Sequence, residues 1–241
     1  MSLRIRPGLV AATSVALVIL CSLGVWQLKR LEWKTALIAQ MTERLAADPI
    51  AFDDALARVA AGENMEYQPV FLAGAYAHES ESLVFGTFDG APGVYVFTPL
   101  DVRKSATGEP RYVYVNRGFT PQEFRDRSAR ADGDVAGDVR VEGLLRYAER
   151  RRGFEKWLAP VDQPNDNLYF VRDPAVLAER RQIVASPYYV DSFGRESAAK
   201  WPRGGLTRVD IPNRHFEYAL TWFGLAAALL AVFFAFSFKR D

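Results

Sequence analysis

The sequence is poor in the residues that most catalytic and metal sites require. Its 241 residues include only two histidines, His78 and His215, and one cysteine, Cys21. One cysteine cannot form an internal disulfide, and a structural zinc site needs about four Cys and His ligands, which this chain does not have. A Ser-His-Asp or Cys-His arrangement requires a base with an orienting partner, and no nucleophile motif lies near His78. These shortages predict that the protein is not an enzyme.

Neither sign of charge is in excess. The chain has 30 Lys and Arg against 29 Asp and Glu, a formal net charge of +1. Phosphate binding requires a clustered excess of Lys and Arg, so we expect no nucleic acid among the partners. The triplet Arg150-Arg151-Arg152 is expected to be solvated or to contact lipid headgroups. The sequence also has no Walker loop and no GxGxxG after a predicted strand, so a nucleotide site is not indicated.

Two long apolar runs without charge are the strongest feature present, at residues 9–28 and 218–238. A helix of about twenty residues crosses a hydrocarbon core of about 30 Å at 1.5 Å per residue. Because every backbone amide in lipid must pair within its own segment, such runs are far more often helices than irregular chain. We therefore predict two transmembrane helices, with both termini on one side of the membrane and lipids as partners.

The first run has two other interpretations. Arg4 and Arg6 precede it as in a cleaved signal peptide, but its apolar stretch exceeds the usual length of roughly 7 to 15 residues, and no small-x-small cleavage site follows. Cys21 follows the bulky Leu20, which disfavours a lipid-modified cysteine, so we interpret it as an apolar residue of the helix. Positive charges flank both runs on both sides and do not choose an orientation.

The chain between the runs is predicted to be rich in short strands. Helical spacing continues after the first run to about Ala46, and a second short helix is expected at residues 52–60. Seven β-rich runs separated by Gly, Pro, Asn and Asp follow at residues 70–76, 82–88, 94–100, 112–116, 139–145, 168–172 and 188–193. Their spacing predicts an antiparallel sheet or small barrel, covered by a helix at 173–182.

Alternation within the run 139–145 predicts how one strand is oriented. Val139, Val141, Gly143 and Leu145 would face the core. The residues that alternate with them would face a largely wet surface; they are Arg140, Glu142, Leu144 and Arg146. The predicted fold class is thus an α+β membrane protein. A first transmembrane helix lies within residues 1–28, an extramembrane domain spans 29–217, and a second transmembrane helix with its tail spans 218–241.

His215 differs from His78 because it lies about one turn before the second apolar run. On a continuing helix, His215, Tyr218 and Trp222 share one face at spacings i, i+3 and i+7. A neutral imidazole at the membrane surface can coordinate a metal centre, and the neighbouring rings can pack against a flat apolar cofactor.

A matching face is predicted on the first helix at the same depth. Trp26, Arg30 and Trp33 share it by the same spacing, and Arg30 can pair with carboxylates at the water boundary. The two faces together suit an amphipathic porphyrin. The alternative is an ordinary interfacial belt, since Trp, Tyr, Arg and His commonly contact lipid headgroups.

A series of short motifs runs in order along the chain. They are Gly24-Val25-Trp26-Gln27 with Arg30, Trp33 and Lys34; Gly74 and Tyr76; Pro92-Gly93 with Thr98-Pro99-Leu100; Val115-Asn116-Arg117-Gly118; Glu142-Gly143-Leu144-Leu145-Arg146; Pro160, Pro164, Asn167 and Asp173; Pro202 with Gly204-Gly205; and Asn213, His215, Tyr218, Ala219, Thr221 and Trp222. With the paired spans, this order resembles the surfeit-locus-one family of cytochrome c oxidase assembly factors. The resemblance covers the chain from the first span to the second.

The resemblance implies a non-catalytic chaperone that binds heme a and assists its insertion into the oxidase core subunit, subunit I, together with other oxidase assembly factors. His215 matches the family's histidine at the start of the second span, the position proposed for ligation of the heme iron. Departures flank it, because Arg214 stands where Asn is common and Glu217 replaces Gln, so propionate pairing is expected to differ from that in relatives.

The resemblance also implies that the central domain faces the bacterial periplasm or the mitochondrial intermembrane space. The first run begins within about ten residues of Met1 and leaves no room for a transit peptide, so we expect the bacterial inner membrane. Two other functions remain open at this point. One is a scaffold that binds oxidase subunits without heme, and the other is a membrane-anchored enzyme of unknown substrate.

Overall fold

The structure is a computed structural model of the chain, and its contacts divide it into two compact units. The helix pair consists of α1 as far as Thr42 together with α5, and the barrel domain begins at Glu43. The residues described are 7–102, 112–149, 153, 160–195, 201–205 and 213–237. The predictions for Arg4, Arg6 and the arginine triplet at 150–152 lie outside them.

The two apolar runs form the helices α1 (Pro7–Leu45) and α5 (His215–Ser237), as predicted. Their apolar windows have mean hydropathies of 2.3 and 2.2, so both helices are long and apolar enough to cross a membrane. Helix α1 has 39 residues. At 1.5 Å per residue it is about 58 Å long, roughly twice a hydrocarbon core, so it continues well beyond a span as the sequence indicated.

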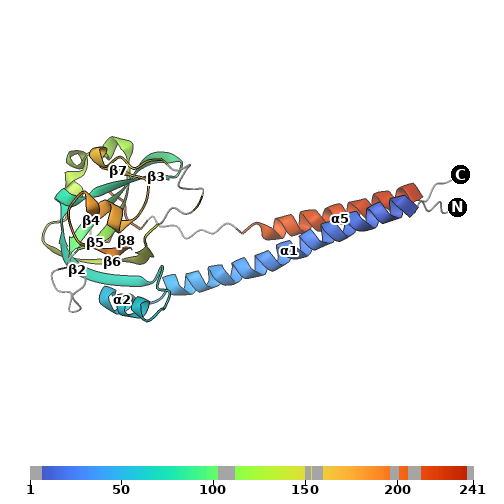
Figure 1. The fold of residues 1–241 in the computed structure, drawn as a ribbon, viewed down its shortest axis with the longest axis horizontal. Helices are drawn as coiled ribbons and strands as arrows, with labels where there is room; N and C mark the ends of the chain where they lie inside the picture. The colour runs from blue at the N-terminus through green and yellow to red at the C-terminus, as the bar shows by residue number, and fades with distance from the viewer. Residues whose placement is uncertain are drawn as a thin grey trace. The chain divides into compact units, whose positions relative to one another are not determined.

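The helix pair is antiparallel and packs along one seam (Figure 1). The least exposed positions recur at alternating spacings of three and four residues, which is the pattern of a coiled-coil contact. They are Thr13, Leu17, Leu20, Gly24, Gln27, Leu31 and Lys34 on α1, and His215, Ala219, Trp222, Ala226, Leu229 and Phe233 on α5. A Cβ atom on Gly24 would lie 2.7 Å from the Phe223 ring, so this glycine lets the helices approach closely.

The barrel domain is built on a closed five-stranded β-barrel (Figure 1). Its strands are β2 (Pro69–Tyr76), β4 (Ala91–Asp101), β5 (Tyr112–Pro121), β6 (Asp138–Tyr147) and β8 (Ala185–Ser192). They pair in the order β2-β6-β8-β5-β4, and β2 closes the ring onto β4. The pairing of β5 with β8 is parallel and the others are antiparallel. The predicted fold class is confirmed, with a barrel that is mixed.

Shorter elements decorate the barrel. Strand β3 (Ser82–Phe88) forms a hairpin with β4, and two-residue strands β1 (Ile50–Ala51) and β7 (Leu168–Tyr169) pair parallel with β2 and β3. Helix α2 (Phe52–Ala60) occupies the residues predicted for it, and α4 (Pro174–Glu179) begins after the Asp173 cap. The described residues of the domain also form four 3₁₀ turns: η1 (His78–Ser80), η2 (Gln122–Phe124), η3 (Arg127–Gly133) and η4 (Pro164–Asp166).

The barrel interior is apolar and fully closed to solvent at its centre. Val70, Leu100, Val115, Leu145 and Val190 come from five different strands and are all 0% exposed. Helix α2 adds Phe52, Ala55 and Leu56 to the same cluster. Burial of each such side chain stabilises the fold by about 1.5–3 kcal/mol, so this core is what fixes the loops that join the strands.

The prediction of a wet outer face on β6 was wrong at its end. Leu144 and Arg146 are only 3% and 8% exposed. Arg146 Nη1 donates to Asp191 Oδ2 on β8 at 2.6 Å, and its guanidinium lies 4.4 Å from the Tyr67 ring. Side chains from elsewhere in the domain therefore cover this strand, which alternation along one segment does not reveal.

Gly118 explains one motif of the sequence. Its φ is +121°, and a Cβ atom would lie 1.7 Å from the carbonyl oxygen of Arg203. Phe119 and Arg203 exchange backbone hydrogen bonds of 3.0 and 2.9 Å at this point. Only glycine allows the 201–205 segment to pair so closely with β5.

Candidate functional site

His215 is the first residue of α5 and is held by the first helix. Its Nδ1 lies 2.7 Å from Oε1 of Gln27, which is 8% exposed on the seam. A carbonyl oxygen only accepts hydrogen bonds, so the Nδ1 atom carries the proton and donates it. When the ring is neutral, a proton on Nδ1 leaves the lone pair on Nε2, the form in which imidazole binds metals.

The Nε2 atom of His215 makes no hydrogen bond to any residue that the structure describes. Clusters of three or more His, Cys, Asp or Glu side chains able to hold a metal are also absent from the described part of the chain. Through Nε2, His215 can supply one ligand to a metal whose other ligands come from elsewhere. Iron in a porphyrin is such a metal, because the macrocycle supplies four nitrogens and the protein supplies one or two axial ligands.

The other predicted site residues take different positions. Trp222 is half-buried on the seam with His215, whereas Trp26, Arg30 and Tyr218 are exposed, the Trp26 and Tyr218 side chains at 55% and 53%. The Arg30 guanidinium lies 4.0 Å above the Trp33 ring. None of the three exposed side chains makes a hydrogen bond or ring contact with His215 among the described residues.

Helix geometry relates these exposed side chains to one another. Gly24 faces Phe223 on one flank of the helix pair. Successive residues turn by about 100°, so Trp26 and Tyr218 project from the opposite flank. This flank combines exposed aromatic rings with the exposed Arg30 and borders the seam that contains His215.

A second polar contact joins the helix pair beside His215. Asn213 Nδ2 donates to Thr35 Oγ1 at 3.3 Å, two residues before the histidine. Arg214 and Glu217, which flank the histidine, are both exposed. The start of α5 is thus fixed to α1 at two points, and the charged neighbours remain available to groups outside the protein.

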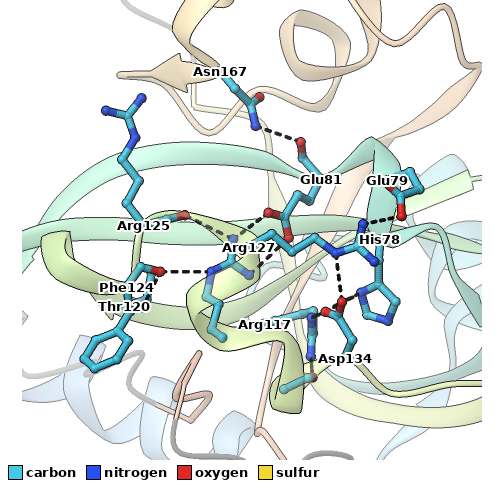
Figure 2. A network of polar contacts seen from close by, with 12 residues as sticks. His78, Glu79, Glu81, Arg117, Thr120, Phe124, Arg125, Arg127, Asp134 and Asn167 are labelled. Atoms are coloured by element: carbon cyan, nitrogen blue, oxygen red, sulfur yellow. Dashed lines mark hydrogen bonds and ion pairs between the residues drawn. The ribbon is translucent and has the colours of Figure 1, made fainter.

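The other histidine, His78, belongs to a dense polar network in the barrel domain (Figure 2). Its Nε2 lies 3.0 Å from the Val135 carbonyl, and its Nδ1 lies 3.3 Å from Arg117 Nη1 and 3.2 Å from Asp134 Oδ1. Burial lowers the pKa of His78 below its ordinary value, and the Arg117 charge acts in the same direction. Both ring nitrogens are used by the protein, so this histidine has no nitrogen available for a ligand.

A buried ion pair lies in the same network. Arg130 is 1% exposed and donates through both terminal nitrogens to Glu81, with Nη2 2.5 Å from Oε1. Its Nε donates to the Phe124 carbonyl at 3.1 Å, and Asn167 donates to the backbone oxygen of Glu81 at 3.0 Å. Every charge here is matched by a partner, which is the arrangement of a structural network.

Gln27 is the site residue that sequence reasoning did not single out. The signal was present, because Gln27 is a polar side chain inside the first apolar run, one turn after Gly24. Gln27 matters because it lies on the side of α1 that faces α5. The sequence does not identify that side, because α1 is hydrophobic all round in this region.

Comparisons with known proteins agree with the motif order. The family model described as the SURF1 family matches residues 14–227. Surfeit locus protein 1 from Rattus norvegicus is 31% identical over 227 residues, covering 88% of this chain and 70% of the relative. The Homo sapiens protein of the same name is 31% identical over 228 residues, covering 88% and 72%. A SURF1-like protein from Monosiga brevicollis is 33% identical over 227 residues, covering 89% and 82%. The resemblance predicted from the motifs is confirmed, and the chain belongs to the SURF1 family.

Proposed function

We propose that this protein is a non-catalytic assembly factor of cytochrome c oxidase that binds heme a as cargo while the core subunit matures. Family membership supports the assembly role, through the resemblance described above. The heme part is supported by one observation above all. His215 is held through Nδ1 at the edge of two apolar helices, and its Nε2 has no partner among the described residues.

The surroundings of His215 fit the chemistry of a heme. A porphyrin is a flat apolar ring with two carboxylates at one edge, and it needs apolar contact on its faces and cations at that edge. Trp222 lies on the seam with His215, and Trp26 and Tyr218 expose their rings on one flank. Arg30 on the same helix face as Trp26 is the cation placed to meet a propionate.

The proposal includes an orientation in the membrane. Both helices would span it, with the barrel domain in the periplasm of a bacterium or the intermembrane space of a mitochondrion. The two apolar helices support the spans, and the family resemblance supports the side. A protease added to intact spheroplasts or mitoplasts should cleave loops of the barrel domain, and protection of that domain would contradict the orientation.

A scaffold that binds oxidase subunits without heme is the second candidate. A pocket of about 470 Å³ on the barrel domain favours it, lined by Phe52, Phe71 and Val102 together with Asp101, Asp138 and Arg140. An apolar hollow with charged groups at its rim can accept an apolar anchor side chain of a partner protein. The enzyme alternative has no comparable support, and measurable turnover of a substrate would be needed to restore it.

The test compares the two histidines. Protein purified in detergent from cells that make heme a should carry a heme absorption band, and His215→Ala should lower heme per protein roughly tenfold, equivalent to about 1.4 kcal/mol of binding free energy. His78→Ala is the matched control and should retain the heme. Unchanged occupancy in His215→Ala would contradict the site. Copurification of oxidase subunits with a protein that never carries heme would favour the scaffold.

A further inference from the structure

We propose that Gln27 is a positioning residue for heme ligation, holding His215 in the tautomer and orientation that present Nε2 to iron. The inference rests on the proposed function. Its basis is the 2.7 Å contact between Gln27 Oε1 and His215 Nδ1, made by a polar side chain that is 8% exposed. No other described polar group competes for that ring nitrogen.

The contact selects one chemical form of the histidine. A neutral imidazole carries its proton on either nitrogen, and only the nitrogen without the proton can bind a metal. A carbonyl oxygen at Nδ1 stabilises the Nδ1–H form, so the lone pair is on Nε2. Metal-binding histidines generally donate their other N–H to a carbonyl or carboxylate, which orients the ring and makes the ligand more basic.

Small residues lie one turn from Gln27 and one turn from His215 on the seam. Gly24 lies one turn before it on the seam, and Ala219, 1% exposed, lies one turn after His215 on α5. These small residues allow the close approach that a 2.7 Å side-chain contact between helices requires. The Asn213 to Thr35 hydrogen bond fixes the chain just before His215.

The competing explanation is that Gln27 only joins the helices, as polar side chains often do in membranes. The two explanations differ in what Thr35→Val should do. This variant removes the neighbouring interhelix hydrogen bond at Thr35 Oγ1 and leaves the contact of His215 intact. If Gln27 only joins the helices, losing its contact and losing the Thr35 contact should have similar effects. If Gln27 positions His215, only the loss of the Gln27 contact should change the tautomer of His215.

The first experiment needs no heme. The full chain has two histidines, so ¹⁵N-histidine labelling in detergent gives the ring-nitrogen signals of two imidazoles, and His78→Ala leaves the Nδ1 and Nε2 signals of His215 alone. In this background we expect a protonated Nδ1 and an unprotonated Nε2. Adding Gln27→Leu should shift the ring towards the Nε2–H form, and adding Thr35→Val should not. Equal tautomer populations with Gln and with Leu at this position would overturn the inference.

The second experiment measures ligation. Gln27→Leu should lower heme affinity roughly tenfold or more, the usual effect of losing a partner of a metal-binding histidine. Gln27→Glu keeps an acceptor, so it should retain heme, and its stronger acceptor should lower the reduction potential of the bound iron. The inference would be overturned if His215→Ala loses heme while Gln27→Leu keeps the heme affinity and absorption spectrum of the unmodified protein. Retention of heme by His215→Ala would overturn the proposed function instead.

Discussion

The two histidines of this chain differ in how many of their ring nitrogens have a partner in the protein. In the barrel domain, His78 is contacted at both ring nitrogens. Nε2 lies against the Val135 carbonyl, and Nδ1 lies against Arg117 and Asp134, which Figure 2 shows. In the helix pair, His215 is hydrogen-bonded at Nδ1 and has no partner at Nε2 among the described residues. The same side chain is thus part of a closed network in one region and a group with unused binding capacity in the other.

The same difference holds for the polar residues around them. The barrel domain buries Arg130 against Glu81 and Arg146 against Asp191, and Arg117 donates to the Gly133 carbonyl. Between the described parts of the two helices, the polar contacts are those of Gln27 with His215 and of Asn213 with Thr35. The buried arginines Arg130, Arg146 and Arg117 of the barrel domain all donate to a partner within that domain, so their contacts stabilise the fold. Polar groups within apolar helices are few and costly, so each is a candidate for function.

The largest effect should come from breaking a closed network in the barrel domain. Arg130→Ala leaves the Glu81 carboxylate buried without its partner, which should cost about 3–5 kcal/mol in the free energy of unfolding. The change in free energy of unfolding can be measured by unfolding the full chain with guanidinium in detergent, with hydrogen exchange of the barrel amides as the readout. The double variant Glu81→Leu with Arg130→Met should recover most of the loss. A single variant as stable as the unmodified protein would show that the pair is not structural.

The next largest effect should come from overpacking the seam of the helix pair. In Gly24→Leu the new side chain would enter the Phe223 ring, whose nearest atom is 2.7 Å from the Cβ position. Overpacking of this kind costs roughly 1–3 kcal/mol, here by forcing the helices apart and loosening the contact of His215 with Gln27. We expect reduced heme per protein and a changed His215 tautomer, with barrel unfolding unaltered.

The control for Gly24→Leu removes the obstruction on the other helix. Adding Phe223→Ala should restore both the tautomer and the heme, because the space for the leucine is then available. Loss of barrel stability in Gly24→Leu would contradict the separation of the two regions, since Gly24 and Phe223 both belong to the helix pair.

A smaller effect concerns the pH dependence of the barrel domain. Burial lowers the pKa of His78, so the folded state binds its proton less readily than the unfolded state does. As pH falls below about 6.5, the unfolded state takes up the proton first, and the free energy of unfolding decreases. In His78→Gln the unfolding temperature should depend less on pH, when thermal unfolding is compared above and below a pH of about 6.5. Equal slopes in the two proteins would show that another group is responsible.

Much of the fold was predictable because the signals are local. Helix α2 begins at Phe52 with Asp53 and Asp54 in its first turn, and Gly62 follows its end, so one segment contains every signal. The parallel pairing of β5 with β8 has no such signal. It depends on the path of more than sixty intervening residues and on which strands remain unpaired. The burial of Arg146 likewise depends on Tyr67 and Asp191, which only the fold brings to it.

The site divides in the same way. The ends of the two apolar runs predicted that His215 lies level with the end of the first run. The helical period predicted that Trp26 and Arg30 share one face. The contact with Gln27 did not follow, because an apolar helix does not reveal which side meets its partner. The network of His78 joins residues from three separate segments of the chain, at positions 78, 117 and 134, so no spacing in the sequence predicts it.

The smallest expected effect tests whether burial, and not the ion pair itself, makes the barrel network stabilising. Arg58 Nη2 lies 2.6 Å from Glu63 Oε2, almost the same separation as in the Arg130–Glu81 pair. Both side chains of the first pair are 49% exposed, whereas those of the second are 0% and 8% exposed. Water and salt screen an exposed pair, and holding two long side chains together costs conformational entropy. Arg58→Ala should therefore leave the unfolding transition unchanged within error, in the same assay that detects Arg130→Ala. Equal losses in the two variants would mean that the separation of the charged groups, and not their exposure to solvent, decides how much an ion pair stabilises this domain.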